Sequence, residues 1–368
     1  MLRTTLLRFG ASGIKTPFPS TTHKPQPYTG PAYDQIVKDR KKWMPNFYFH
    51  YYKEPLLIVE GSMQYLYDHT GKRYIDCVSG ISTISCGHSH PTITKVLQEQ
   101  SSKLAHTSPI YASEWQGEYS KRICQELGDG FDSVFLCNSG SEANDFAVYL
   151  TRLYTHEYKF YSLKNAYHGL VGAAGNITSV GTWNSPMRGG FEFEKLAWPS
   201  TYRGASQTLE EYIKDAEETI NATAGGGKIA GMIAEPIQGV GGINPLPAGY
   251  MVKMAELVRK YNGLVIADEV QTGFGRVGTK YWGHRWQGVK PDIVTMAKGI
   301  GNGFPMAAVA TRKEITDKIT QVFFNTFGGG HLQCRVGIEV LDTIRREKLP
   351  ENAEKVGGYL IAELTKLK

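Results

Sequence analysis

The sequence predicts an α/β fold with a mostly parallel central sheet and helices on both of its faces. Four short apolar runs lack the alternation of half-buried strands, and they lie at residues 133–137, 229–233, 264–267 and 293–296. Segments with helical spacing separate these runs, and strands that alternate with helices favour parallel pairing under helical cover. The chain has 368 residues, 41% hydrophobic and 21% charged, which is ordinary for a globular protein with a large core.

The first 33 residues differ in composition from the rest of the chain. They contain no Asp or Glu, while Arg3, Arg8, Lys15 and Lys24 stand among many Ser and Thr residues. An acid-free basic leader of this kind predicts a mitochondrial transit peptide, and therefore a protein of the mitochondrial matrix. A disordered tail is the alternative interpretation.

The remaining chain is predicted to form a large domain and parts of a smaller α+β domain. Residues 34–95 form the N-terminal segment of the smaller domain, and alternating residues on either side of 69–72 predict a hairpin there. The large domain is expected over residues 96–335. Residues 336–368 begin the C-terminal part of the smaller domain, which is expected to be incomplete because the chain ends on a helical pattern.

Charge and cysteine content exclude several classes of function. The net charge is +6, but no basic run is interleaved with aromatic residues, so we expect no nucleic-acid partner. No apolar run is long enough to span a membrane. The five cysteines form no C-x-x-C pair, and His88 and His90 lack a third ligand nearby, so no metal site is expected.

A strand followed by a helix start at residues 138–144 (NSGSEAN) is a candidate phosphate site. Ser139 and Glu142 have the spacing of a capping box, which marks the helix start independently. Free backbone N–H groups and the positive end of the helix dipole meet there, and both favour an anion. Most capped helices bind nothing, so the motif indicates such a site only together with others.

Two chemically active side chains follow predicted strands. Asp268 comes directly after residues 264–267, where α/β proteins place their ligands. Lys298 follows residues 293–296 and precedes a glycine-rich turn, which allows close approach to a ligand. A carboxylate at such a position can pair with a protonated pyridine nitrogen, and a lysine can form a covalent bond to a carbonyl. Alone, either could be an ordinary surface residue.

Together these motifs resemble the class III aminotransferases. The resemblance is carried by residues 138–144, 166–169 (AYHG), 234–239 (AEPIQG), 266–276 (IADEVQTGFGR) with Lys298, and 325–329 (NTFGG). It implies a fold-type I enzyme that depends on pyridoxal 5′-phosphate, with small amino acids and 2-oxo acids as substrates.

The resemblance assigns several residues to the cofactor. Lys298 would hold the cofactor covalently and shuttle a proton between the substrate carbon and the cofactor. Asp268 would keep the pyridine nitrogen protonated, and Gln271 would hydrogen-bond the ring hydroxyl. Gly140 and Ser141 would bind the phosphate at the helix start.

Other residues are assigned to the ring, the substrate and the neighbouring subunit. Tyr167 would stack on the ring with His168 beside it, since an aromatic face covers a planar cofactor well. Thr326 would reach the phosphate of the neighbouring subunit, which implies a homodimer or a dimer of dimers. Glu235 would be an acid near the substrate. Ile81 stands where ornithine-specific members carry a tyrosine, which argues against ornithine.

Within the family, the likeness is densest to the mitochondrial branch that transfers an amino group from alanine, or another amine, to glyoxylate. Family members continue beyond the position that matches Lys368, and the arginine that receives the substrate carboxylate lies in that stretch. A chain that ends at Lys368 is therefore expected to be at best weakly active. The alternatives are another ω-aminotransferase, a phospho-lyase of the same family, or a non-catalytic chain that binds the cofactor.

Overall fold

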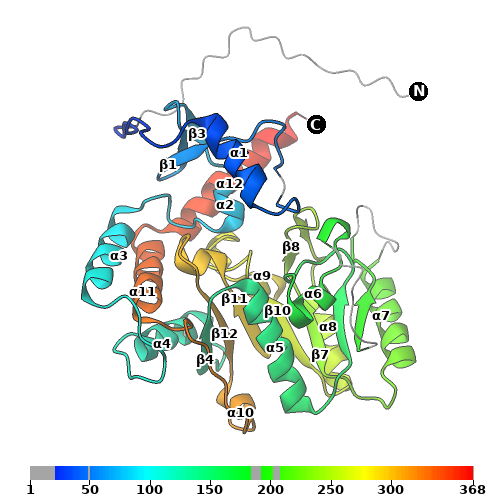
Figure 1. Ribbon diagram of the computed structural model, residues 1–368. Coiled ribbons are helices and arrows are strands. Elements are labelled where there is room, and N and C mark those ends of the chain that lie inside the picture. The colour runs from blue at the N-terminus through cyan, green and yellow to red at the C-terminus, as the bar shows by residue number, and fades with distance from the viewer. Residues whose placement is uncertain (1–20, 49, 184–191, 201, 203–207, 368) are drawn as a thin grey trace. The chain divides into compact units, whose positions relative to one another are not determined.

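The computed structural model describes residues 21–48, 50–183, 192–200, 202 and 208–367 (Figure 1). Most of the basic leader therefore lies outside the described residues. The chain divides into two compact units, Met1–Ile75 and Asp76–Lys368. The domain boundaries expected from the sequence at 95/96 and 335/336 stay a prediction.

The first unit contains a helix and a small antiparallel sheet. Helix α1 (Tyr33–Trp43) precedes strands β1 (Ile58–Ser62), β2 (Tyr65–Asp68) and β3 (Arg73–Ile75), which lie in that order in the sheet. The hairpin predicted around residues 69–72 is confirmed, because β2 and β3 pair antiparallel. Asp68 closes its turn by accepting hydrogen bonds from Thr70 N at 2.9 Å and from the Tyr74 hydroxyl at 2.8 Å.

The second unit is built on a seven-stranded sheet, and its mostly parallel character confirms the predicted fold class. Strand β12 is antiparallel to both of its neighbours, β4 and β11, whereas the other neighbouring strands pair in parallel. All four predicted strands are present, although the second begins at Gly231 rather than at residue 229. The strands in spatial order are β4 (Ser133–Cys137), β12 (Ala307–Thr311), β11 (Ile293–Met296), β10 (Leu264–Asp268), β7 (Gly231–Ala234), β5 (Phe160–Leu163) and β6 (Phe193–Leu196).

Helices cover both faces of this sheet. Successive residues of β10 point to opposite faces, so Ile266 packs in one core cluster and Val265 and Ala267 in the other. The first cluster includes residues of α5 (Gly140–Thr155), α6 (Gly172–Ile177) and α10 (Lys313–Thr316). The second includes residues of α3 (Pro91–Lys103), α4 (Gln116–Leu127), α7 (Leu209–Thr223), α8 (Tyr250–Lys260) and α11 (His331–Arg346).

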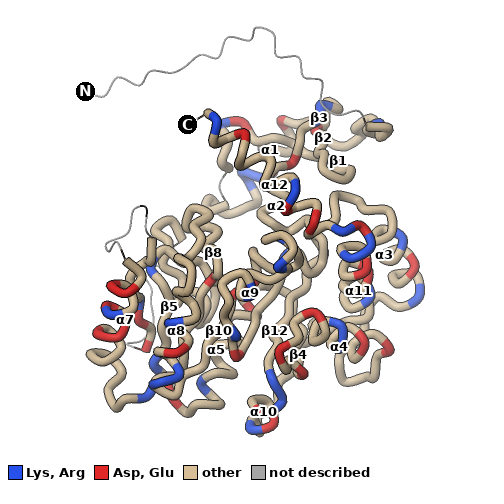
Figure 2. The backbone as a smooth tube through the Cα atoms, turned by 180° about the vertical axis from the view of Figure 1, so that it is seen from behind, with Lys and Arg blue, Asp and Glu red and all other residues tan. Residues whose placement is uncertain are grey.

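Short elements connect this framework. They are α2 (Ser79–Ser82), the 3-10 helices η1 (Gly181–Trp183), η2 (Gly278–Lys280) and η3 (Lys298–Gly301), the paired strands β8 (Ile237–Gln238) and β9 (Asn244–Pro245), and α9 (Gly283–Gln287). The 17-residue helix α12 (Leu349–Thr365) follows α11. Basic and acidic residues are interspersed along α3, α7 and α11 (Figure 2). Among the described helices, none has the length and apolarity needed to cross a membrane. His88 and His90 bond different carboxylates, those of Asp76 at 2.7 Å and Glu347 at 2.9 Å.

Candidate active site

The carboxyl ends of five strands bring most of the predicted site residues to one edge of the sheet. Strands β4, β5, β7, β10 and β11 share one direction, as their parallel pairings and their common antiparallel neighbour β12 show. Four features come after strands β4, β5, β7 and β11, and they are the α5 start, Tyr167, Glu235 and Lys298 in that order. Asp268 is the last residue of β10. This edge is where open α/β sheets bind ligands, so it is the candidate site, and the roles assigned to these residues stay predictions.

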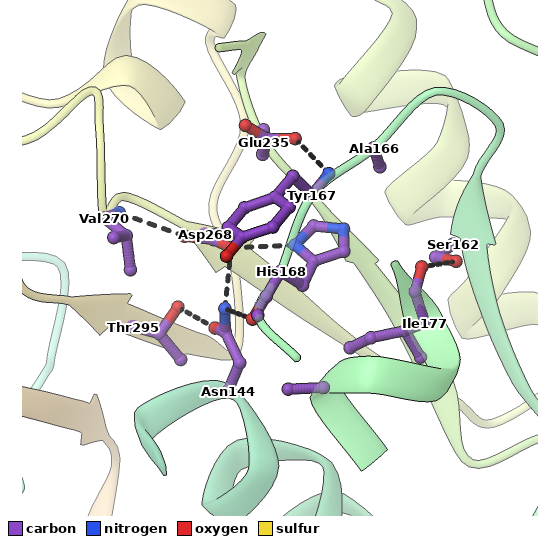
Figure 3. Close-up of polar contacts among 12 residues, drawn as sticks. Asn144, Ser162, Ala166, Tyr167, His168, Ile177, Glu235, Asp268, Val270 and Thr295 are labelled. Carbon is purple, nitrogen blue, oxygen red and sulfur yellow. Dashed lines mark hydrogen bonds and ion pairs between the residues drawn. The ribbon is translucent and has the colours of Figure 1, made fainter. Parts of the chain in front are cut away.

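Asp268 is the centre of a buried hydrogen-bond network (Figure 3). Its side chain is 3% exposed, and its Oδ2 accepts hydrogen bonds from Asn144 Nδ2 at 2.8 Å and His168 Nδ1 at 2.7 Å. Its Oδ1 accepts from Val270 N at 3.0 Å. Three nitrogen atoms of the chain therefore donate to the two oxygens of this buried carboxylate and fix its orientation.

Asn144 is a site residue that the sequence reasoning missed. Its Nδ2 also donates to His168 O at 2.8 Å, and its Oδ1 accepts from Thr295 Oγ at 2.6 Å. The side chain therefore joins α5, the segment after β5, and β11 around the carboxylate. The available signal was a polar residue between Ala143 and Ala147 on the apolar face of the helix.

The start of α5 is capped, although not by a complete capping box. Ser139 Oγ accepts from Glu142 N at 3.2 Å, as the spacing predicted. Glu142 Oε2, however, accepts from Asn138 N at 2.8 Å, one residue before the position that a capping box requires. A Cβ on Gly140 would lie 3.0 Å from a Val270 methyl group, so α5 starts in direct contact with the segment after Asp268.

Gly169 and Ser141 complete this corner of the site. Gly169 has φ of +123°, and a Cβ there would lie 2.4 Å from Ser141 Oγ. Only glycine adopts such a conformation without strain while allowing so close an approach. The segment after β5 therefore lies directly against the α5 start, beside the hydroxyl that the resemblance assigns to phosphate.

Lys298 is the first residue of η3, and Ala297 alone separates it from the end of β11. Its φ of +50° is in the left-handed region, which is uncommon for a residue with a side chain and costs on the order of 1 kcal/mol or more. Burial lowers the pKa of Lys298, while the carboxylates of Asp268 and Glu235 act in the opposite direction. A lowered pKa makes the neutral amine, the nucleophilic form, more accessible.

Glu235 links two loops of the site. Its Oε1 accepts a hydrogen bond from Tyr167 N at 2.9 Å, and its Oε2 accepts one from Gly239 N at 3.0 Å. Gly239 in turn lies against Gln271, because a Cβ on the glycine would lie 2.1 Å from Gln271 Oε1. Burial raises the pKa of Glu235 to about 7.

This raised pKa makes a testable contribution to stability. Between pH 4.5 and about 7 the folded state holds a proton on Glu235 more often than the unfolded state does. The free energy of unfolding therefore falls as pH rises through this window, by up to about 3 kcal/mol from this group. We expect Glu235→Gln to lack this component, so its stability relative to the native sequence rises from pH 5 to pH 8. Denaturant unfolding of the apoprotein at pH 5 and pH 8 measures this difference in the free energy of unfolding. Glu256→Gln, on an exposed position, is the control. The same pH dependence in the native protein and both variants would contradict the raised pKa of Glu235.

Two predicted residues lie outside the buried network. Thr326 is exposed, in the segment between α10 and α11. Ile81 is 57% exposed and has φ of +64° inside the kinked helix α2. Their assigned roles concern the neighbouring subunit and the substrate, and both roles stay predictions.

Comparison with known proteins gives a consistent assignment. The family model described as aminotransferase class-III matches residues 48–368. The chain is 42% identical to alanine–glyoxylate aminotransferase 2 homolog 2, mitochondrial, of Arabidopsis thaliana, over 95% of this chain and 73% of that protein. It is 38% identical to human alanine–glyoxylate aminotransferase 2, mitochondrial, over 96% of this chain and 74% of the human one.

Solved structures agree with the sequence relatives. An (S)-enantioselective ω-transaminase from Thermomicrobium roseum superposes with a TM-score of 0.85 at 33% identity, covering 92% of this chain and 81% of that one. A PLP-bound amine transaminase from an uncultivated Pseudomonas species gives 0.82 at 29% identity, covering 88% and 79%.

Proposed function

This chain belongs to the class III aminotransferases, pyridoxal-phosphate-dependent enzymes, and from that premise we propose that it transfers the amino group of alanine, or of another amine, to glyoxylate. With alanine as the donor, the products are pyruvate and glycine. The proposal on substrates is supported by relatives named for alanine and glyoxylate at 38–42% identity. A lyase and a non-catalytic chain are not favoured, because these relatives and the structural neighbours named above are transaminases. The chain is also 35% identical to an acetylornithine aminotransferase of Methanosarcina mazei, so N-acetylornithine is the second candidate amino donor.

The single observation that carries the proposed cofactor-dependent amino transfer is the buried Asp268, whose carboxylate has two side-chain hydrogen-bond donors. A buried carboxylate, oriented by these donors at the sheet edge, is the kind of group that can pair with a protonated pyridine nitrogen. His168 Nε2 is buried and has no hydrogen-bond partner among the described residues, so this network contains a polar atom that a bound group could satisfy. The donor set, the α5 start and the adjacent lysine thus fit the cofactor.

When bound, pyridoxal phosphate supplies an electron sink for the electron pair of the substrate Cα–H bond. Lys298 Nζ would hold the cofactor covalently in the resting enzyme and, once the substrate amine has replaced it there, would be the base that moves the proton of the substrate Cα. Asp268 holds the proton on the ring nitrogen, and Gln271 bonds the ring hydroxyl. Burial of the Lys298 amine favours its unprotonated form, which both tasks require.

The remaining assignments follow from the same premise. Gly140 and Ser141 bind the phosphate at the α5 start, where backbone N–H groups and the helix dipole favour an anion. Tyr167 covers the ring, and Glu235 is an acid near the substrate, with Ile81 at the substrate side. Thr326 reaches the phosphate of a neighbouring subunit, so the working enzyme is a homodimer or a dimer of dimers.

We also infer a mitochondrial location, in the matrix, supported by the acid-free basic leader and by relatives whose names include "mitochondrial". A reporter fused to residues 1–33 tests it. A reporter that stays in the cytosol would leave the leader as an ordinary tail.

The substrate proposal is tested by separating the two half-reactions. Alanine added to the enzyme in its cofactor-loaded form is expected to release about one pyruvate per active site, because amino transfer stops without an acceptor. Glyoxylate added next is expected to give one glycine. N-acetylornithine and γ-aminobutyrate are the comparison donors. Faster single-turnover release from either of them than from alanine would overturn the choice of donor but not the reaction type.

A further inference from the structure

The side chain of Asn325 ties the segment that carries Thr326 to the α5 start. Its Nδ2 donates to Glu142 Oε1, and its Oδ1 accepts from Asn138 Nδ2 at 3.1 Å. The same Oδ1 accepts from the backbone N–H groups of Phe327, at 3.2 Å, and Gly328, at 2.8 Å. Asn325 thus folds the turn around Thr326 and attaches that turn to the residues that begin the helix.

The turn is also fixed at its far side. A Cβ on Gly328 would lie 2.1 Å from the carbonyl oxygen of Leu136, at the end of β4. The carbonyl oxygen of Gly329 accepts from Gln116 Nε2 at 2.8 Å. Between these anchors Thr326 is exposed, and the flanking Phe324 and Phe327 are 60% and 58% exposed. Thr326 is therefore an exposed residue on an anchored turn with exposed aromatic neighbours, a composition typical of a surface that meets another protein.

The α5 start does not depend on Asn325 for its own capping. Ser139 Oγ accepts from Glu142 N at 3.2 Å, and Glu142 Oε2 accepts from Asn138 N at 2.8 Å. Both bonds remain when the Asn325 side chain is removed. The loss of Asn325 is therefore expected to free the Thr326 turn while leaving the phosphate end of the same subunit intact.

We propose that Asn325, anchored by Glu142, is a positioning residue that acts in the partner subunit's cofactor site by fixing Thr326 for the phosphate bound there. The proposal rests on the proposed dimer and on the proposed role of Thr326. It adds that the phosphate site of each subunit depends on a side-chain clamp located in the other subunit.

Mixed dimers of the full chain show whether Asn325 affects cofactor affinity in the partner subunit or in its own subunit. Two differently tagged chains are co-expressed, and dimers carrying both tags are purified and stripped of cofactor. In the first arrangement one subunit carries Lys298→Ala and the other Asn325→Ala. The only covalently competent site then belongs to the Asn325→Ala subunit and receives Thr326 from an intact turn. In the second arrangement both substitutions are in one subunit, so the competent site receives Thr326 from the freed turn.

The readout is the dissociation constant of pyridoxal phosphate at the lysine-competent site, followed by absorbance, with inorganic phosphate as a competitor. We expect native affinity in the first arrangement and affinity about tenfold weaker in the second, the order expected for weakening one hydrogen bond to a charged group. Equal affinities, or weaker affinity in the first arrangement, would overturn the proposal, as would a monomer that binds the cofactor as tightly as the native dimer.

Further variants test the role of Asn325 apart from the proposed role of Thr326, and they also show whether a substitution has damaged the fold. Glu142→Gln removes the charged acceptor of Asn325 but also alters the acceptor of Asn138 N at the α5 start of its own subunit, so it is expected to weaken cofactor affinity in both arrangements. Asn352→Ala, on the exposed side of α12, is the matched control and is expected to change neither arrangement. Thr326→Val tests the premise: if it weakens the partner's site while Asn325→Ala does not, the clamp is refuted and the dimeric site stands. If Thr326→Val also has no effect in the partner, the proposed role of Thr326 fails with it.

Discussion

Lys298→Ala is expected to abolish transamination and to leave the protein without covalently held pyridoxal phosphate. The substitution removes the amine that bonds the cofactor and the base that moves the substrate proton, and proton transfer by a positioned group alone contributes about 10²–10⁴-fold. We therefore expect at least about a 10³-fold loss of kcat/KM for alanine. The yellow colour of the native protein should be lost on dialysis, because only non-covalent contacts remain.

Two controls distinguish lost chemistry from a lost fold. Lys290→Ala changes an exposed lysine just before β11 and is expected to keep activity and colour. A small added amine, such as methylamine, is expected to restore part of the activity of Lys298→Ala, because it can serve as the missing base. Substantial activity in Lys298→Ala without added amine would show that another residue holds the cofactor.

Asp268→Asn is expected to slow the half-reaction with alanine by at least about 100-fold, or about 2.7 kcal/mol in the barrier, while pyridoxal phosphate still binds. The neutral amide cannot hold a proton on the ring nitrogen, so the electron sink weakens. The phosphate contacts proposed for the α5 start do not involve Asp268, so we expect binding to persist. Single-turnover absorbance measures the rate, and equilibrium titration measures binding.

The Asp268→Asn substitution also affects the hydrogen-bond network around this position. The oxygen of the introduced amide can still accept from Asn144 and His168, but its N–H₂ group then faces Val270 N, which is a donor. We expect a modest loss of stability in addition to the slow chemistry. Asp317→Asn, on an exposed position near α10, is the control for the loss of one negative charge. A near-native single-turnover rate in Asp268→Asn would show that the carboxylate is structural.

Local patterns predicted those parts of the fold that are determined by neighbouring residues. The hairpin around residues 69–72, the strands that end at Asp268 and before Lys298, and the Ser139 cap all depend on short stretches of sequence. The carboxyl ends of parallel strands meet at one edge, so the grouping of Asp268 and Lys298 at that edge followed as well, while their functional roles stay predictions.

Contacts between distant residues could not be read in the same way. Asn144 reaches Asp268 across 124 positions of sequence, and Thr295 reaches Asn144 across 151. Which polar side chain turns inward depends on the packing of α5 against the sheet, and several polar residues share that helix. The Asn325–Glu142 clamp is of the same kind, because it joins segments 183 positions apart.

Backbone conformation at the site was also not evident from residue type. Lys298 has φ of +50° and Ile81 has φ of +64°, although neither type favours the left-handed region. The glycine-rich turn after Lys298 indicated close approach to a ligand but not this strain. Strained non-glycine residues persist only where the surrounding packing holds them, and that packing forms only in the folded chain.

The central claim is that Lys298 is the residue that holds the cofactor, and one measurement tests it directly. The native protein, loaded with pyridoxal phosphate, is reduced with borohydride, digested and mapped by mass spectrometry. We expect one phosphopyridoxyl group per chain, on the peptide that contains Lys298. The group on any other lysine, or no covalent group in protein that binds the cofactor and transaminates, would contradict the account.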